Sequence, residues 1–489
     1  MNLQHPVDVP AKIVLGLLVF LSVVALLPWN PHGPFDARDW TTIEGVNVEM
    51  LWIGIVLEPY AALLHVITGA PDFRIAALSF GLWVVLVTTL VMYLRRRDLI
   101  LWRRVSLAVL TGLFGFWFFF AALLFYAHVH FPGWTLTVDD RQWLVADLQS
   151  HTLGSHDGLA RAEYNLRWHA QRGYDVVAVT EHDDPTGSFY AESIADAVDG
   201  VTVIPGIELA NEYGGYILGL GLKQEKVAVA PFLQATEGFS KHFTELVTRT
   251  HDGAVIAMAW RMNPAQIDEL VGHGVHAFEL INQGHPDIPV AVRETMLRHE
   301  QEGRIRLVSS TDWHGWGGGS RTWTLLQVPY AEQMTPVERK QAILTLLREG
   351  DRSQVIPVVA GYHGPPHMLR AIFSPPAELV RYAAELSPLR LLSWWLWIGI
   401  FWLLARRMRE HGYCAGRVYL SGVALLMGGI LLVRGLQLHQ LQPESDIMLS
   451  TVTKELGMMA MYAAIPIVVS GLWLLAYEMR RHRGKSRHD

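Results

Sequence analysis

Histidine and carboxylate side chains gather at four places in the middle of the chain, each at the end of a short apolar run typical of a buried strand. Residues two apart on a strand point to the same face, so Asp312 and His314 can approach one ion together. Imidazoles mixed with carboxylates suit Zn, Mn or Fe better than Ca or Mg. A single such residue is usually a cap or a satisfied polar group. The metal-site prediction therefore rests on four places together, which carry His151 and Asp157, Glu181 and His182, Glu208, and Asp312 and His314.

Alternating strand-like and helix-like segments must position these side chains. The expected strands cover 143–149, 175–181, 201–209, 215–222, 253–260, 277–282, 306–314 and 323–329. The expected helices between them cover 159–172, 187–198, 233–250, 264–272 and 289–302. This alternation predicts a mostly parallel sheet, open or closed into a barrel, with its chemistry at the carboxyl ends of the strands.

The ordered set DLQSHT with HDG, TEHDD, PGIE and STDWH resembles the PHP (polymerase and histidinol phosphatase) family over roughly residues 140–330. The resemblance implies a distorted (β/α)7 PHP-like barrel that binds up to three metal ions and hydrolyses phosphoesters with an activated water. It also implies six metal ligands in this chain: His151, Asp157, His182, Glu208, Asp312 and His314.

Three positions depart from the family pattern. Gln149 stands where the opening HxH pair has its first histidine, and its amide is a poor ligand. Tyr216 and Met258 replace two histidines that belong to one metal position of the family. We therefore expect that position to be lost and one or two divalent ions, Zn, Mn or Fe, to remain. His251 and His285 are candidate substitutes, although each is more simply a surface or helix-end histidine.

Two further features limit the chemistry. The only cysteine, Cys414, excludes a cysteine-based zinc or iron–sulfur site. Arg321 follows a flexible glycine-containing run and is a candidate catalytic residue that binds a phosphate group, with a solvated loop arginine as the alternative. With His182 and Asp312 it completes the predicted catalytic set.

A net charge of -6 and the absence of a basic tract in the middle of the chain argue against nucleic-acid binding.

The composition predicts an integral membrane protein, because 51% of the residues are hydrophobic and only 18% are charged. Six apolar runs are long enough to span a bilayer: 12–29, 74–94, 104–127, 389–405, 418–436 and 456–477, the last interrupted by Pro466. The run 48–70 contains Glu58 and His65, which favour a re-entrant or surface segment.

Arginine clusters indicate the orientation. They lie between the second and third spans, between the fourth and fifth, and in the tail: Arg95–Arg97 with Arg103 and Arg104; Arg406, Arg407, Arg409 and Arg417; and residues 480–487. Basic residues in short loops stay in the cytoplasm. All three clusters are inside only if the central domain is on the non-cytoplasmic side and the C-terminus is cytoplasmic.

The expected organisation is an N-terminal transmembrane region (1–134), a PHP-like metal-binding domain (135–365), a linker helix (366–388) and a C-terminal transmembrane region with a basic tail (389–489). The function this favours is a membrane-anchored, metal-dependent phosphoesterase that acts on a phosphoester, an envelope or lipid-linked one being a candidate. Its expected partners are the lipid bilayer and this substrate. The alternative is a non-catalytic metal- or ligand-binding sensor or scaffold.

Overall fold

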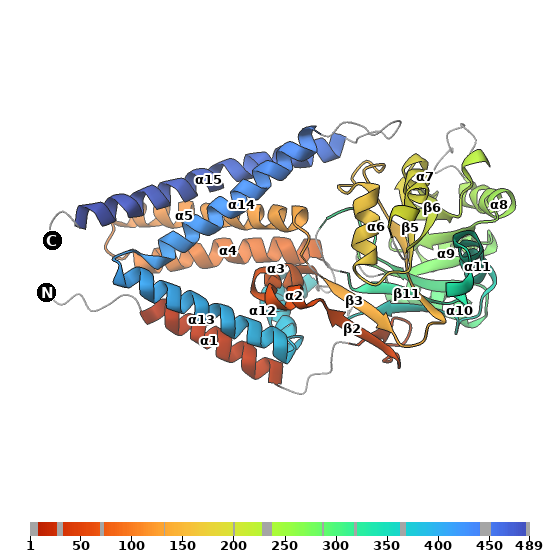
Figure 1. Ribbon diagram of the computed structural model, residues 1–489, viewed down its shortest axis with the longest axis horizontal. Helices are drawn as coiled ribbons and strands as arrows, with labels where there is room; N and C mark the ends of the chain where they lie inside the picture. The colour runs from red at the N-terminus through yellow and green to blue at the C-terminus, as the bar shows by residue number, and fades with distance from the viewer. Residues whose placement is uncertain are drawn as a thin grey trace.

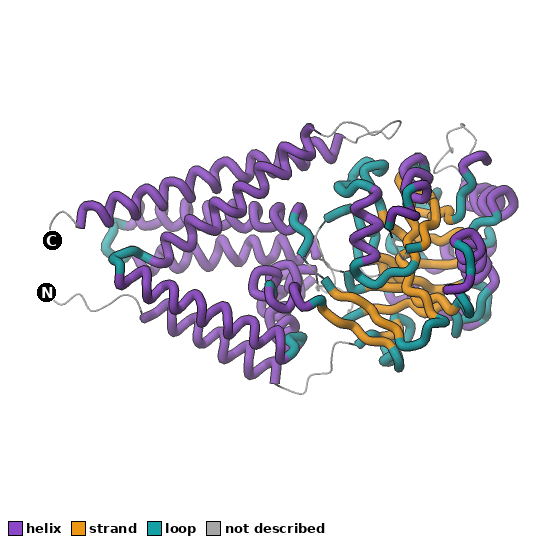
Figure 2. Tube along the Cα trace, viewed as in Figure 1, coloured by secondary structure: helices purple, strands orange, loops and turns teal. Residues whose placement is uncertain are grey.

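A computed structural model describes residues 8–26, 33–68, 73–131, 133–198, 201–226, 237–285, 288–316, 320–361, 368–440 and 451–485. Long helices form one half of the molecule and an α/β domain forms the other (Figure 1). Two strands precede the third long helix in the chain, and the other described strands follow it. Helices cover the outside of the sheet (Figure 2).

The α/β domain is built on one curled sheet of ten strands in the order β1-β12-β11-β4-β5-β6-β7-β8-β9-β10. The sheet curls until β10 contacts β4, β11 and β12. Its strands are β1 (Phe35–Asp36), β4 (Trp143–Ser150), β5 (Val176–His182), β6 (Thr202–Ala210), β7 (Tyr216–Leu220), β8 (Ala254–Met258), β9 (Ala277–Asn282), β10 (Arg306–Ser310), β11 (Thr322–Gln327) and β12 (Val355–Val359).

The sheet is mixed, which corrects the expectation of a mostly parallel one. The pairs β4–β5, β5–β6, β8–β9 and β9–β10 are parallel. The pairs β6–β7, β7–β8, β4–β11, β11–β12 and β1–β12 are antiparallel. A curled α/β sheet is therefore present.

The helices of this domain begin and end close to the predicted positions. Capping boxes start two of them: Asn263 and Gln266 at α9, and Thr335 and Glu338 at α11, each followed by a proline in the first turn. The helices are α6 (Ala162–Ala170), α7 (Thr186–Ser193), α8 (Phe239–His251), α9 (Pro264–Gly272), α10 (Val290–Gln301) and α11 (Pro336–Glu349), with 3-10 turns η1 (Ala195–Ala197), η2 (Gln224–Lys226) and η3 (Ala331–Gln333).

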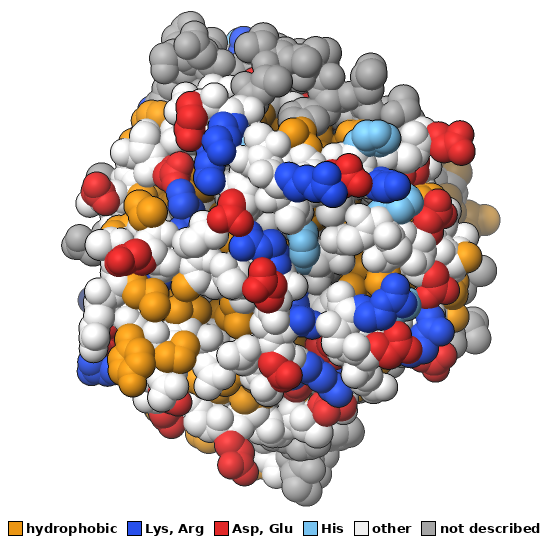
Figure 3. Space-filling view, turned by 90° about the vertical axis from the view of Figure 1, so that its right-hand side faces the viewer, with side chains coloured by type: hydrophobic (Ala, Val, Ile, Leu, Met, Phe, Trp, Pro, Cys, Tyr) orange, Lys and Arg blue, Asp and Glu red, His pale blue; other side chains and the backbone are white. Residues whose placement is uncertain are grey.

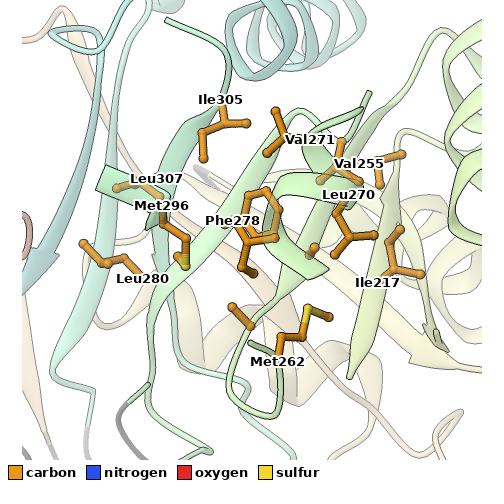
Figure 4. Close-up of a cluster of buried hydrophobic side chains, with 14 of the residues drawn as sticks. Ile217, Val255, Met262, Leu270, Val271, Phe278, Leu280, Met296, Ile305 and Leu307 are labelled. Atoms are coloured by element: carbon orange, nitrogen blue, oxygen red, sulfur yellow. The ribbon is translucent and has the colours of Figure 1, made fainter. Parts of the chain in front are cut away.

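Strand β8 shows why these strands are almost continuously apolar. Val255 and Ala257 join a cluster beneath the outer helices, whereas Ile256 and Met258 face the inside of the curled sheet. Because both faces are buried, both sets of alternating residues must be apolar. The outer cluster is drawn in Figure 4, where Phe278 lies among side chains from strands and helices.

Two N-terminal strands belong to the α/β domain, although the sequence placed residues 1–134 in the membrane region. Strand β1 pairs with β12, and β2 (Val46–Met50) pairs with β3 (Trp134–Val138) in a second, two-stranded sheet. Arg38 fixes this segment because its guanidinium forms buried ion pairs with Asp36 and Glu300.

Five of the described helices are long and apolar enough to cross a membrane, over Ile75–Arg95, Leu101–His128, Pro388–Glu410, Ala415–Gln440 and Lys454–His482. Their outward side chains are strongly apolar and exposed, as Leu82 and Leu426 illustrate. The helices concerned are α4 (Phe73–Arg95), α5 (Leu101–His128), α13 (Pro388–Glu410), α14 (Ala415–Gln440) and α15 (Thr451–Lys485). The first predicted span coincides with α1 (Asp8–Leu26), and its last residues, 27–29, lie outside the described part of the chain.

The run 48–70 does not form a single long helix. It contains the end of β2, then α2 (Trp52–Val56) and α3 (Glu58–Thr68); residues 69 and 70 lie outside the described part. A helix of 11 residues is too short to cross about 30 Å of hydrocarbon. The ionisable side chains of Glu58 and His65 are buried, and Glu58 forms an ion pair with Arg390.

Buried charges join α3 to the helices that follow the α/β domain. The carboxylate of Glu58 accepts hydrogen bonds from Arg390 (2.7 and 2.9 Å) and from the Tyr382 hydroxyl (2.7 Å). Glu58 and Arg390 are both almost completely buried. Tyr382 belongs to α12 (Met368–Ala384), the predicted linker helix, which packs against α1, α3 and α4.

Candidate metal centre

The six predicted ligands converge at one edge of the sheet. His151 directly follows β4, His182 ends β5, and Glu208 lies near the carboxyl end of β6. Asp312 and His314 follow β10, and Asp157 comes from the loop after β4. These strand ends meet because β4, β5 and β6 are parallel neighbours while β10 curls back to contact β4.

One group of ligands is deeply buried. The Nε2 atom of His151 lies 3.1 Å from the Glu208 carboxylate and 3.2 Å from that of Asp312. The other ring nitrogen, Nδ1, is 2.9 Å from the Ser155 hydroxyl. Since that hydroxyl itself donates to Glu181, Nδ1 of His151 is the donor, and Nε2 is left to face the two carboxylates.

The second group is more open. Asp157 Oδ1 lies 3.5 Å from His182 Nε2 and 3.3 Å from His314 Nε2, and the two Nε2 atoms are 3.5 Å apart. His314 donates from Nδ1 to the main-chain oxygen of Asp312 at 2.7 Å, which turns its Nε2 towards this group. The exposed imidazole of His156 lies beside Asp157 and His182.

Both groups fit a transition-metal ion. Around an ion with bonds of about 2.1 Å, adjacent donors lie about 3.0–3.5 Å apart, and the separations above are 3.1–3.5 Å. Moreover, His151 Nε2, Asp157 Oδ1 and Asp312 Oδ1 are buried atoms without hydrogen-bond partners among the described residues. Such atoms are costly unless something binds them, so the donors are arranged for a ligand that the protein itself does not supply.

Other residues of the motifs position the ligands. Glu181, next to His182, accepts hydrogen bonds from Thr152 and Ser155 and so shapes the loop after β4. Asp147 accepts from the Thr311 main chain at 3.0 Å and lies 2.9 Å from Nε2 of His169. These contacts hold Asp312 in a left-handed conformation (φ 52) that an aspartate adopts only at a cost.

The electrostatics of the site reflect this crowding. Burial alone would lower the pKa of His151, but the adjacent carboxylates of Asp312 and Glu208 raise that pKa well above the ordinary value. Burial and the charge of His151 lower the pKa of His182 to about 2. Protons therefore compete with a metal ion for His151, whereas His182 is already in the neutral form that binds metals.

The three departures from the family pattern lie together at the buried group. Nε2 of Gln149 donates to Glu208 at 2.6 Å and lies 3.4 Å from the sulfur of Met258. Met258 is the register partner of Tyr216, whose ring centroid is 6.2 Å from that of His182. The Gln149 amide thus binds the same carboxylate oxygen of Glu208, Oε2, that faces His151.

His285 belongs to the site, contrary to the simpler interpretation of it as a surface histidine. Its Nε2 lies 3.4 Å from Asp312, and its ring stacks on Trp260 with centroids 4.3 Å apart. With Glu279 and Asn282 it lines a small cavity of about 20 Å³. His251 is elsewhere, where Nδ1 accepts a hydrogen bond from the Lys223 main chain.

Arg321 is not directed at the metal ligands. Its guanidinium is buried and forms an ion pair with Glu385 at 3.1 Å, and its main-chain N–H donates to Gln283. Glu385, just after α12, also binds Arg381. The predicted phosphate contact is therefore replaced by a link between the α/β domain and the helical half. Gly317–Gly319, of the glycine run before Arg321, lie outside the described residues.

Replacing Glu385 by Gln is expected to destabilise the protein, because the buried guanidinium of Arg321 and the partly buried one of Arg381 lose the carboxylate that they share. Removing one partner of a buried ion pair costs about 3–5 kcal/mol. Thermal unfolding of the purified full chain measures this loss. Glu410→Gln, at an exposed ion pair with Arg406, is the matched control and should leave the unfolding temperature nearly unchanged.

Comparisons with known proteins give only distant likenesses. No protein-family model and no curated protein sequence matches the chain. A two-domain protein from Bacteroides vulgatus, described as containing a predicted PHP-like metal-dependent phosphoesterase, is similar with 17% identity and a TM-score of 0.33 over 47% of this chain and 69% of that chain.

Two further solved structures are similar at 15% identity and a TM-score of 0.27. One is a protein from Bifidobacterium adolescentis described as a metal-dependent phosphoesterase, matched over 35% of this chain and 87% of that chain. The other is an amidohydrolase from Chromobacterium violaceum with bound sulfate and no metal, matched over 40% and 95%. At these values the likenesses carry no information on substrate or activity.

Proposed function

We propose that this chain is a membrane-anchored, metal-dependent hydrolase of phosphoesters. The observation that carries the proposal is the convergence of six imidazole and carboxylate side chains into two groups with the spacing of metal ligands. His151, Glu208 and Asp312 would hold one ion, and Asp157, His182 and His314 a second.

The bound ions would supply Lewis acidity towards a phosphoryl group and make a water molecule more acidic. The residues of the chain would position the ions and fix the tautomers of their histidine ligands. Ser155 fixes the tautomer of His151, the main chain at Asp312 fixes that of His314, and the buried carboxylates provide negative charge that holds cations. In hydrolysis, the oxygen of water forms a bond to phosphorus, the ester P–O bond breaks, and the leaving oxygen takes up a proton.

We further propose that the apolar helices span the cell membrane, with the α/β domain on the non-cytoplasmic side and the C-terminus in the cytoplasm. The arginine clusters at the carboxyl ends of α4, α13 and α15 support this orientation. Reporter fusions after Gly133 and after the last residue test it. A cytoplasmic signal from the fusion after Gly133 would contradict the proposed topology.

A hydrolase is distinguished from a non-catalytic metal-binding sensor by assay of the purified full chain. We expect hydrolysis of an aryl phosphomonoester or phosphodiester that stops when a chelator removes the metal and returns when Mn²⁺ or Zn²⁺ is added. Tight metal binding without hydrolysis of either ester would favour the sensor or scaffold.

A further inference from the structure

Among the described residues, the candidate metal centre is most open on the side that carries Asp157. His151, Glu208 and Asp312 are buried, whereas the side chain of Asp157 is 32% exposed and that of the neighbouring His156 is 61% exposed. His314, with 18% of its side chain exposed, belongs to the same open side. A substrate must therefore approach over the two loops that carry His156–Asp157 and His314–Trp316.

These loops lie against the end of a long apolar helix. His130 is two residues beyond α5, and its Nε2 lies 2.7 Å from the main-chain oxygen of Gly315. Its Nδ1 lies 2.5 Å from the hydroxyl of Tyr164 in α6. Because a carbonyl only accepts, Nε2–H of the neutral ring donates to Gly315 and Nδ1 accepts from Tyr164. The open side of the metal centre is thus held directly at the end of α5.

Two large aromatic side chains are exposed at this place. Trp316 and Tyr164 are each 43% exposed. The indole N–H of Trp316 donates to the main-chain oxygen of Asp157 at 3.1 Å, so this ring is fixed beside a predicted metal ligand. Exposed Trp and Tyr side chains at the end of a membrane helix are typical of the level of the lipid headgroups.

A cationic side chain reaches the same place from another long helix. Arg434 lies in the last turns of α14, which packs against α5, and its charge acts to lower the pKa of both His130 and Tyr164. Its Nη1 donates to Gln437, and its side chain is partly exposed. A guanidinium presents several N–H donors in a planar fork that matches phosphate oxygens.

The opposite end of the α/β domain has a different surface. The face turned away from the helices carries lysine and arginine side chains interspersed with aspartate and glutamate (Figure 3). Such a surface is typical of contact with water. The combination of exposed aromatic rings, a guanidinium and predicted metal ligands instead occurs where the α/β domain meets the end of α5, against which α14 packs.

We propose that the surface formed by His130, Tyr164, Trp316 and Arg434 binds the phosphate-bearing headgroup of a lipid, and that a lipid-anchored phosphoester is the substrate class. Arg434 contacts the phosphate, the rings of Tyr164 and Trp316 lie along the apolar start of the anchor, and the ester bond reaches the open side of the metal centre. This inference rests on the proposed hydrolase activity and adds to it the origin of the substrate.

The test compares lipid-borne with soluble phosphoesters. Phosphatidic acid and phosphatidylglycerol in detergent micelles are paired with glycerol 3-phosphate and glycerophosphoglycerol, and an aryl phosphate reports the metal centre itself. For the full-length protein we expect kcat/KM for a lipid probe to exceed that for its soluble partner by at least about 10-fold, since the soluble partner has the same phosphate but no acyl chain, and burying about two methylene groups against the rings contributes that much. Equal values for lipid and soluble probes would overturn the inference.

Single substitutions test which residues bind the lipid. Arg434→Gln should lower kcat/KM for the lipid probe by about 10-fold while changing aryl phosphate hydrolysis by less than about twofold. Trp316→Ala should lower kcat/KM for the lipid probe more than for the aryl probe, and its effect on the aryl probe measures the loss of the bond to the Asp157 main chain. Arg298→Gln and Tyr330→Ala, which change an exposed arginine of α10 and an exposed tyrosine after β11, are the matched controls and should change neither. An equal loss on lipid and aryl probes would show that the variants damage the metal centre and would also overturn the inference.

A binding measurement separates this inference from the proposed activity. Native mass spectrometry of the detergent-solubilised chain, titrated with phosphatidic acid or with inorganic phosphate, should show lipid adducts that Arg434→Gln weakens by about 10-fold. Retention of phosphate but not of phosphatidic acid would overturn the lipid assignment. Lipid binding without hydrolysis of any probe would refute the proposed activity and leave the lipid site supported.

Discussion

Replacing His182 or Asp312 by Ala is expected to abolish metal-dependent hydrolysis while the protein stays folded. His182 contributes Nε2 to the open group of donors, and Asp312 contributes Oδ1 to the buried group. Loss of a ligand removes the ion's stabilisation of the reacting phosphoryl group, which is worth several kcal/mol, so kcat/KM should fall by about 10³-fold or more. Hydrolysis of an aryl phosphate at saturating Mn²⁺ measures the loss.

The fold of each variant is followed by circular dichroism and thermal unfolding. If an alanine variant unfolds, His182→Asn and Asp312→Asn keep the size of the side chain and still remove the strong ligand. His242→Ala, which changes an exposed histidine of α8, is the matched control. Full activity of either ligand variant, with metal still required, would mean that the ligands have been assigned incorrectly.

The existence and order of the elements in the α/β domain could be predicted from the sequence. Helix α9 and strand β9 have the predicted bounds, 264–272 and 277–282. Apolar runs separated by turn residues and capping signals are local patterns, and they are sufficient for this purpose. The six predicted metal ligands were named from polar residues at or near strand ends together with the resemblance to a known family, and the structure brings these side chains together.

Strand direction could not be read from the same patterns, since parallel and antiparallel strands with two buried faces have similar sequences. One signal was available. Asn211, Gly214 and Gly215 form the tight connection between β6 and β7, in which the Asn211 side chain accepts from the Gly215 main chain. An Asn- and Gly-rich segment of this length between two strands is typical of an antiparallel hairpin.

Contacts between residues far apart in the chain could not be predicted from the sequence either. Arg321 pairs with Glu385, 64 positions away, and Phe35 pairs with Val359 in the sheet. Nothing local to either residue identifies such a partner. His285 could have been predicted as a site residue, because it follows the carboxyl end of β9, the same kind of position as the other candidate residues.

The chain is expected to bind at most two metal ions tightly. In the family that it resembles, the third position uses the places held here by Tyr216 and Met258, and neither a phenol nor a thioether suits Zn, Mn or Fe as imidazole does. The structure keeps both residues near the predicted ligands, since Met258 contacts Gln149 and Tyr216 lies beside His182. Glu208 alone would remain for a third ion.

Elemental analysis of gently purified protein measures this stoichiometry. Among the described residues, His285 is a further imidazole at the site, and it lies against Asp312 and Trp260. A His285→Ala variant that keeps two ions would agree with this geometry. Three ions per chain would contradict the prediction of a reduced metal site.

Gln149→His should tighten binding at the buried group. The Gln149 amide is 2.6 Å from Glu208 and is held by Asn282 at 2.9 Å, so an imidazole in its place would reach the donors around His151. Replacing a weak neighbour by a good ligand is expected to raise affinity by about 10- to 100-fold. Competition with a chromogenic chelator measures it. Gln142→His, at a position outside the centre, is the control, and an unchanged affinity in Gln149→His would mean that the buried group does not bind metal.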